Sequence, residues 1–274
     1  MNNNPIITAT QLHQQLAEPA NNIVIIDCRF ALADPNLGQQ QYQTAHIPRS
    51  HHLDLNRDLS SLVQLHGGRH PLPDSIALGA KLAAMGVNAD THIVAYDDSR
   101  FAFAARLWWL LRYYGHKQVS VLDGGYSGWV KAGYPVTADL PQPVLHGNFQ
   151  PHIQTAEIVD IELVRSIQTS PAHILIDSRE VDRYLGKIEP IDPIAGHIPG
   201  AVNYPWQDVS TTDGLILSVE HQQQRWLKIT SEIQPIVYCG SGVTACTNLL
   251  SLEIAGITGA KLYPGSWSDW CSYQ

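Results

Sequence analysis

The chain has 274 residues, a length that fits one large domain or two ordinary ones. Hydrophobic residues make up 44% of it and charged residues 15%, a balance that argues against intrinsic disorder. The net charge is −8, and the excess lies in residues 139–274, which hold 7 Lys or Arg against 15 Asp or Glu. An acidic chain without a basic stripe argues against nucleic acid as a partner.

The sequence has few features that would indicate protein targeting or disulfide bonding. Residues 1–5 have neither a basic region nor an apolar region, and the uncharged stretches are broken by Gly, Pro, Asn or Gln. We therefore expect no secretory signal, no membrane partner and a cytoplasmic location. The cysteines are too few and too unevenly spaced for a disulfide framework, so we expect reduced thiols. Cys and His lack zinc spacing, so we expect no metal and no cofactor.

In the first half, three short apolar runs predict strands buried on both faces. These runs are 23–26, 92–96 and 119–122. A helix is predicted over 73–86, with Asp74 or Ser75 as its cap and Gly86 at its end. A second helix is predicted over 101–114, ending at Gly115.

The second half repeats this alternation. Residues 139–155 lack periodicity and contain three prolines, which predicts a linker between residues 1–138 and 156–274. Strands are predicted over 174–176, 235–238 and 260–263, and helices over 157–168, 219–231 and 243–255. Alternating strands and helices predict an α/β fold in which each half has a mainly parallel central sheet flanked by helices.

Four segments recur in the same order, which indicates two tandem copies of one domain. The matching pairs are 23–29 with 174–179, 45–50 with 196–201, 93–97 with 236–239, and 124–129 with 265–270. The position that matches Cys239 in the first copy is Asp97.

The most specific chemical feature is the loop Cys239-Gly-Ser-Gly-Val-Thr-Ala245, between a predicted strand and a predicted helix. In a parallel sheet this places Cys239 at the carboxyl edge, where ligands bind. Gly240 and Gly242 allow a tight turn whose amides point inward, and these amides favour a thiolate, a persulfide or an anionic substrate. Cys239 is therefore the predicted nucleophile.

Other tempting side chains have structural interpretations. Free cysteine is among the most buried residue types, so we expect Cys28, Cys246 and Cys271 to be packing residues. The histidines in turn-like sequence are expected at the surface. They are His51, His52, His66 and His70.

On these motifs the chain resembles the two-domain rhodanese-type sulfurtransferases. The resemblance covers nearly the whole length, from the doubled His-Ile-Pro segments, 46–48 and 197–199, to the loop at Cys239. It implies two rhodanese-like domains, of which the C-terminal one moves a sulfane sulfur through a cysteine persulfide. The first domain is then expected to be catalytically degenerate, because Asp97 stands at the cysteine position and a carboxylate cannot carry a transferable sulfur. The expected partners are a small-molecule sulfur donor and an acceptor such as thioredoxin, glutathione or cyanide.

The loop resembles that of 3-mercaptopyruvate sulfurtransferases, because thiosulfate-preferring members place basic residues after the cysteine. The family scheme then implies that Ser241 works with a histidine and an aspartate. The matching histidine is His46, and Asp34 is the acid nearest to it in the sequence. The resemblance also implies that Gly240, Gly242, Val243 and Thr244 line the substrate site.

Substrate recognition departs from the family pattern at one position. Mercaptopyruvate enzymes hold the donor with two arginines nine residues apart, and Arg183 matches the first while Asp192 occupies the second. Either Arg183 acts with Arg179, Lys187 or Arg69, or the donor differs. Thiosulfate:cyanide sulfur transfer is thus the main alternative function.

Two further alternatives remain. Cell-division-cycle phosphatases share the fold but need an arginine six positions after the cysteine, where this chain has Ala245. A non-catalytic binding module would be expected to lose the nucleophile from both copies, whereas Cys239 is present.

Overall fold

The computed structural model describes residues 4–18, 21–142 and 145–274, which form two compact units. Unit 1 comprises residues 1–60, 73–154 and 212–216, and unit 2 comprises 61–72, 155–211 and 217–274. Each unit is an α/β domain with a parallel sheet, as the sequence predicts. Among the described residues, no helix has the length and apolar character needed to cross a membrane.

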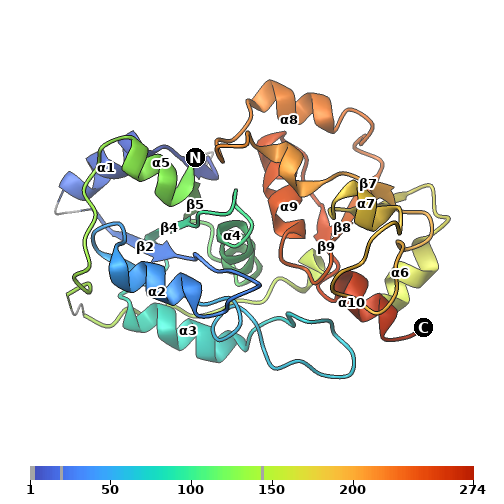
Figure 1. The fold of residues 1–274 in the computed structure, drawn as a ribbon, viewed down its shortest axis with the longest axis horizontal. Helices are drawn as coiled ribbons and strands as arrows, with labels where there is room; N and C mark the ends of the chain where they lie inside the picture. Colours follow the sequence, from blue (N-terminus) through green and yellow to red (C-terminus); the bar gives the residue numbers. More distant parts are fainter. Residues whose placement is uncertain (1–3, 19–20, 143–144) are drawn as a thin grey trace. The chain divides into compact units, whose positions relative to one another are not determined.

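Unit 1 contains a five-stranded parallel sheet in the order β1-β5-β4-β2-β3 (Figure 1). The strands are β1 (Ile6–Ile7), β2 (Ile23–Asp27), β3 (Ser50–His52), β4 (His92–Tyr96) and β5 (Val119–Leu122). The three predicted strands are confirmed as the central β2, β4 and β5. The edge strands β1 and β3 carry only two and three residues, too few for a periodic signal.

The helices of unit 1 cover both faces of its sheet, with α1 and α5 on one side and α3 on the other (Figure 1). They are α1 (Ala9–Ala17), α2 (Leu37–Thr44), α3 (Ser75–Ala84), α4 (Ala104–Tyr113) and α5 (Gly125–Lys131). Leu12 of α1 and Trp129 of α5 pack on Ile25 and Val94 in one buried cluster. Asp74 caps α3 by accepting a hydrogen bond of 2.7 Å from the amide of Ala77, as predicted.

Unit 2 contains a four-stranded parallel sheet in the order β7-β6-β8-β9. The strands are β6 (His173–Asp177), β7 (Val202–Asn203), β8 (Gln234–Tyr238) and β9 (Lys261–Leu262). The helices are α6 (Ile161–Ile167), α7 (Val181–Tyr184), α8 (Val219–Arg225), α9 (Ala245–Ile254) and α10 (Ser266–Cys271), with 3-10 turns at Thr155–Glu157 and Trp206–Val209. Ile236, Tyr238 and Trp267 lie in its core.

The two units exchange short segments. Residues 61–72 come from the first half of the sequence but belong to unit 2, and residues 212–216 of the second half belong to unit 1. The boundaries predicted from the sequence, 1–138 and 156–274 joined by 139–155, do not include this exchange. Phe149, within the predicted linker, is buried and its amide donates to the carbonyl of Val87, so this stretch packs along unit 1.

A buried ion pair recurs at the end of one central strand in each repeat, β2 in unit 1 and β6 in unit 2. In unit 1, Arg29 contacts Asp27 at 2.6 Å and donates to the carbonyl of Ala45 at 2.7 Å. In unit 2, Arg179 contacts Asp177 at 2.6 Å and donates to the carbonyl of Gly196 at 2.6 Å. The repeated Asp-x-Arg sequence therefore ties each strand end to the next His-Ile-Pro segment.

The histidines of the two His-Ile-Pro segments make matching structural contacts. His46 Nδ1 lies 2.6 Å from the carbonyl of Tyr42, and its ring stacks on Tyr42 with centroids 4.0 Å apart. His197 repeats both contacts with Tyr184, at 2.7 Å and 4.0 Å. His46 is fully buried, and its Nε2 lies 3.1 Å from the carbonyl of Asp139. Both ring nitrogens of His46 thus meet backbone carbonyls of its own unit.

We expect His46→Ala and His197→Ala each to lower the free energy of unfolding by about 1–3 kcal/mol, because each leaves a carbonyl without its partner. Urea unfolding followed by circular dichroism measures this loss. The exposed His221→Ala is the control and should leave the midpoint unchanged. Unchanged midpoints for both His46→Ala and His197→Ala would contradict a structural role for the repeated histidine.

Candidate functional site

Cys239 is the first residue after β8 and precedes α9, so it lies at the carboxyl edge of the unit 2 sheet, as predicted. The residue is 2% exposed. Its amide donates to Ser266 Oγ at 3.2 Å, and its carbonyl accepts from the amide of Trp267 at 3.0 Å. The start of α10 therefore fixes the backbone of the nucleophile on both sides.

The turn after Cys239 depends on glycine. Gly242 has a φ of 77°, and a Cβ atom there would lie 2.3 Å from the carbonyl oxygen of Pro264. A side chain would therefore push this loop away from the segment that leads into α10. Val243 and Thr244 complete the turn, and their carbonyls accept from the amides of Cys246 and Thr247 at 3.1 Å.

The matching loop of unit 1 shows what such a turn binds. The carboxylate of Asp97 accepts hydrogen bonds from four amides of its own loop. The donors are Ser99 at 2.8 Å, Phe101 at 3.2 Å, Phe103 at 2.8 Å and Ala104 at 2.9 Å. Burial raises the pKa of Asp97, while these hydrogen bonds oppose the rise. The strand-to-helix loop of unit 1 thus directs its amides at one negative group.

Ser241 is paired with His70. The Ser241 Oγ and the His70 Nδ1 lie 2.8 Å apart, and both residues are buried. The expectation that His70 is a surface residue is therefore wrong, and His70 is a histidine that the structure shows in contact with Ser241. Asp34 is exposed and accepts from the amide of Asn36, a local turn contact.

His70 reaches this position because the 61–72 segment is docked on α10. The amide of Gly67 donates to Asp269 Oδ1 at 2.6 Å, and the amide of Arg69 donates to Ser268 Oγ at 3.1 Å. The sequence signal for this loop is a polar Arg-His pair enclosed by Gly-Gly and Pro-Leu-Pro. Functional residues often lie on loops that a rigid scaffold holds in position.

Two arginines flank the loop beside Cys239. A Cβ atom built on Gly240 would lie 3.2 Å from Nη2 of Arg69 and 3.5 Å from Nη2 of Arg183. Arg69 comes from the docked segment and Arg183 from α7. Burial and the neighbouring Arg183 lower the pKa of Arg69, while Cys239 and Glu189 act in the opposite direction. The predicted Arg183 is thus joined by Arg69, one of its three suggested helpers.

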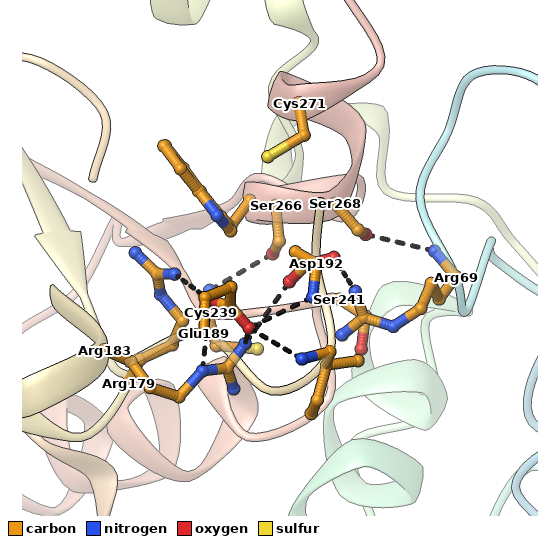
Figure 2. Close-up of polar contacts among 12 residues, drawn as sticks. Arg69, Arg179, Arg183, Glu189, Asp192, Cys239, Ser241, Ser266, Ser268 and Cys271 are labelled. Carbon is orange, nitrogen blue, oxygen red and sulfur yellow. Dashed lines mark hydrogen bonds and ion pairs between the residues drawn. The ribbon is translucent and has the colours of Figure 1, made fainter. Parts of the chain in front are cut away.

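Both arginines are backed by buried acids, as Figure 2 shows around Cys239 and Ser241. Asp192 pairs with Arg69 and lies 3.3 Å from Arg183 Nη2. Glu189 pairs with Arg183 at 2.7 Å and with Arg179 at 3.2 Å. The acid side chains are 2% and 4% exposed, whereas Arg69 is 30% exposed and Arg183 12%. The guanidinium groups therefore face the accessible side.

The other suggested helpers of Arg183 differ from Arg69. Arg179 shares Glu189 with Arg183, but it is 1% exposed and also belongs to the repeated ion pair with Asp177. Lys187 is exposed and pairs with Asp182 at 3.1 Å, away from the acids that hold Arg183.

A cavity of about 630 Å³ lies in unit 1, at the Asp97 loop. Its lining includes Asp97, Asp98, Arg100, Ser127 and Lys131. The Asp97 carboxylate is held by loop amides, and Ser127 Oγ donates to Asp98 at 2.9 Å. The cavity therefore lacks the thiol chemistry that Cys239 gives to unit 2.

The remaining thiols fit the packing role expected for them. Cys28, Cys246 and Cys271 are free and buried, and burial raises the pKa of Cys28 and of Cys271. Within the described part of the chain, no cluster of three or more His, Cys, Asp or Glu residues is suited to hold a metal ion.

Comparisons with known proteins place both halves in one family. The Rhodanese-like domain family matches residues 8–132 and 160–273. The chain is 42% identical over 275 residues to the probable 3-mercaptopyruvate sulfurtransferase of Pseudomonas aeruginosa, covering 98% of this chain and 96% of that one. It is 32% identical over 257 residues to the thiosulfate sulfurtransferase of Mus musculus, covering 90% and 84%.

A solved structure agrees with these matches. SseA from Escherichia coli, a 3-mercaptopyruvate sulfotransferase, superposes with a TM-score of 0.83 at 29% identity. The alignment covers 96% of this chain and 99% of that one.

We expect Asp97→Ala to lower the free energy of unfolding by about 2 kcal/mol or more, because the loop amides lose their shared acceptor. Equilibrium unfolding in urea measures the loss, with the exposed Asp90→Ala as a matched removal of a carboxylate. Equal stability of the two variants would show that the amides do not depend on Asp97.

Proposed function

The chain belongs to the rhodanese family and is a sulfurtransferase, and we propose that Cys239 takes a sulfur atom from 3-mercaptopyruvate and passes it to a thiol or to cyanide. The observation that carries this proposal is the correspondence between the two loops. In unit 1 the loop holds a carboxylate on four amides, and in unit 2 the matching position is a buried thiol.

Sulfur transfer requires that loop to hold two anions in turn. The first is the Cys239 thiolate, which is the nucleophilic form of the thiol. The second is the persulfide formed from it, whose terminal sulfur also carries negative charge. A turn of the kind that stabilises Asp97 suits both, because its backbone amides do not need to rearrange between them.

The donor carboxylate and carbonyl would be held by Arg183 and Arg69. Their terminal nitrogens flank Gly240, next to Cys239, and both side chains are partly accessible. Guanidinium groups bind carboxylates through paired N–H donors, which also orient the bound molecule. A donor held in this way presents its sulfur to the thiolate.

The chemical step breaks the carbon–sulfur bond of the donor and forms a sulfur–sulfur bond at Cys239. The electron pair of the broken bond remains on the organic fragment as pyruvate enolate. The proton of the donor thiol balances the reaction when it moves to the enolate carbon, giving pyruvate and an anionic persulfide. Ser241 and His70, hydrogen bonded at 2.8 Å, are the groups placed to carry this proton.

The second half-reaction is attack by an acceptor on the outer sulfur, in the manner of thiol–disulfide exchange. Thioredoxin, glutathione or another thiol would serve, as would cyanide. All four cysteines are free thiols, which suits a reducing compartment, and we place the protein in the cytoplasm.

Thiosulfate is the second candidate donor, because the relative from Mus musculus is named for it and because two arginines border the loop. The phosphatase alternative has no such support, since position 245 is alanine.

Mass spectrometry tests the proposal directly. Incubation with mercaptopyruvate should add about 32 Da, one sulfur atom, to the peptide that contains Cys239. Cys239→Ala should abolish both the added mass and cyanide-dependent turnover, and Cys28→Ala should retain both. The proposal fails if no sulfur is added with any donor, or if it is added only at another cysteine.

The proton-transfer pair gives a separate prediction. Ser241→Ala and His70→Ala should each lower kcat with mercaptopyruvate by about 100-fold, the usual contribution of general acid–base catalysis. The double variant should lose little more than either single one, because the two groups act as a unit. Single-turnover discharge of the persulfide by cyanide should be retained, since that step produces no enolate. Independent, multiplying losses would argue against the pair.

A further inference from the structure

Sulfur transfer by itself does not explain why buried acids pair with Arg69 and Arg183. Each oxygen of the Asp192 carboxylate contacts a different arginine, Oδ1 contacting Arg69 and Oδ2 contacting Arg183. The Asp192 side chain is 2% exposed, so it is withdrawn from any ligand. A residue that only needed to fill space here would not require a charge that links both guanidinium groups.

The charges of this cluster balance. Three guanidinium groups, of Arg69, Arg179 and Arg183, contact three carboxylates. The carboxylates are those of Asp177, Glu189 and Asp192. The pocket beside Gly240 therefore offers directed N–H donors with little excess positive charge. Once Cys239 ionises, the local balance becomes negative.

The charge balance of this cluster affects singly and doubly charged donors differently. Mercaptopyruvate carries one negative charge on its carboxylate, whereas thiosulfate carries two on a compact group. The repulsion that a donor meets from the thiolate and the two acids grows with its charge, and burial of the acids limits screening by solvent. Asp192 has the larger influence on donor choice, since it touches both arginines while Glu189 touches only Arg183 of the two.

We propose that Asp192, by bridging Arg69 and Arg183 from behind, is the residue that makes the site select a monoanionic 2-oxo acid over a dianionic donor. This inference rests on the proposed function and extends it to the charge class of the substrate. Asp192 is a positioning residue, because it acts on the donor through the arginines.

The test compares kcat/KM for mercaptopyruvate and for thiosulfate, with cyanide as acceptor, in the unaltered enzyme, Asp192→Asn and Asp182→Asn. Asp192→Asn keeps the size and one oxygen acceptor but removes the charge. Asp182→Asn is the matched control, because it removes an exposed carboxylate of the same segment, one that pairs with Lys187.

The thiosulfate-to-mercaptopyruvate ratio should rise about tenfold or more in Asp192→Asn. In Asp182→Asn the ratio should stay within about twofold, as for an exposed pair. If the ratio is unchanged in Asp192→Asn, or if kcat/KM falls equally for both donors, Asp192 only supports Arg69 structurally. Either result would overturn the inference.

A measurement on the unaltered enzyme covers the case in which Asp192→Asn does not fold. Pyruvate, a monoanion, should protect Cys239 from alkylation by iodoacetamide at a concentration about tenfold or more below that needed of sulfate, a dianion. The reverse order would contradict the inference.

Failure of the proposed function would give a different experimental result from failure of the inference. An unaltered enzyme that forms no persulfide with either donor removes the function and the inference together. A persulfide that forms, combined with an unchanged donor ratio, removes the inference alone.

Discussion

A turn that directs backbone amides at one negative group, at the end of a buried strand, is the constraint on which this structure depends. In unit 1 the group is the carboxylate of Asp97, held by four amides after β4. In unit 2 the corresponding turn follows β8 and begins with Cys239. Because the turn is built from main chain, its two copies differ at one side chain, a carboxylate in unit 1 and a buried thiol in unit 2.

The surrounding frame is common to both repeats and so does not distinguish them. The buried Asp-x-Arg pair and the stacked histidine of the His-Ile-Pro segment occur twice with nearly the same distances. The units differ in what is brought to the turn. Residues 61–72 belong to unit 2, where they supply Arg69 and His70 beside Gly240 and Ser241. One repeat thereby provides side chains that complete the chemistry of the other.

Electrostatics at the site depends on pairs as well as on individual charges. Arg69 and Arg183 would make a strongly cationic pocket by themselves, yet Asp192 and Glu189 lie against them at low exposure. Buried carboxylates in such contacts preserve the direction of the N–H donors while cancelling much of the charge. The result is a site suited to orienting a small anion, with little attraction for high negative charge.

The sequence alone determined the doubled α/β architecture, the central strands and the position of Cys239 at the end of a strand, because apolar runs and a glycine-rich turn act locally. It placed Arg183 correctly beside the loop, and it named His46 where the structure has His70. That choice depended on a contact between residues 171 positions apart, Ser241 and His70, and the same docking brings Arg69 to Asp192. These long-range contacts depend on how the chain packs in three dimensions, and local periodicity in the sequence does not predict them. Only the tertiary structure could therefore decide which histidine, arginine and acid share the site.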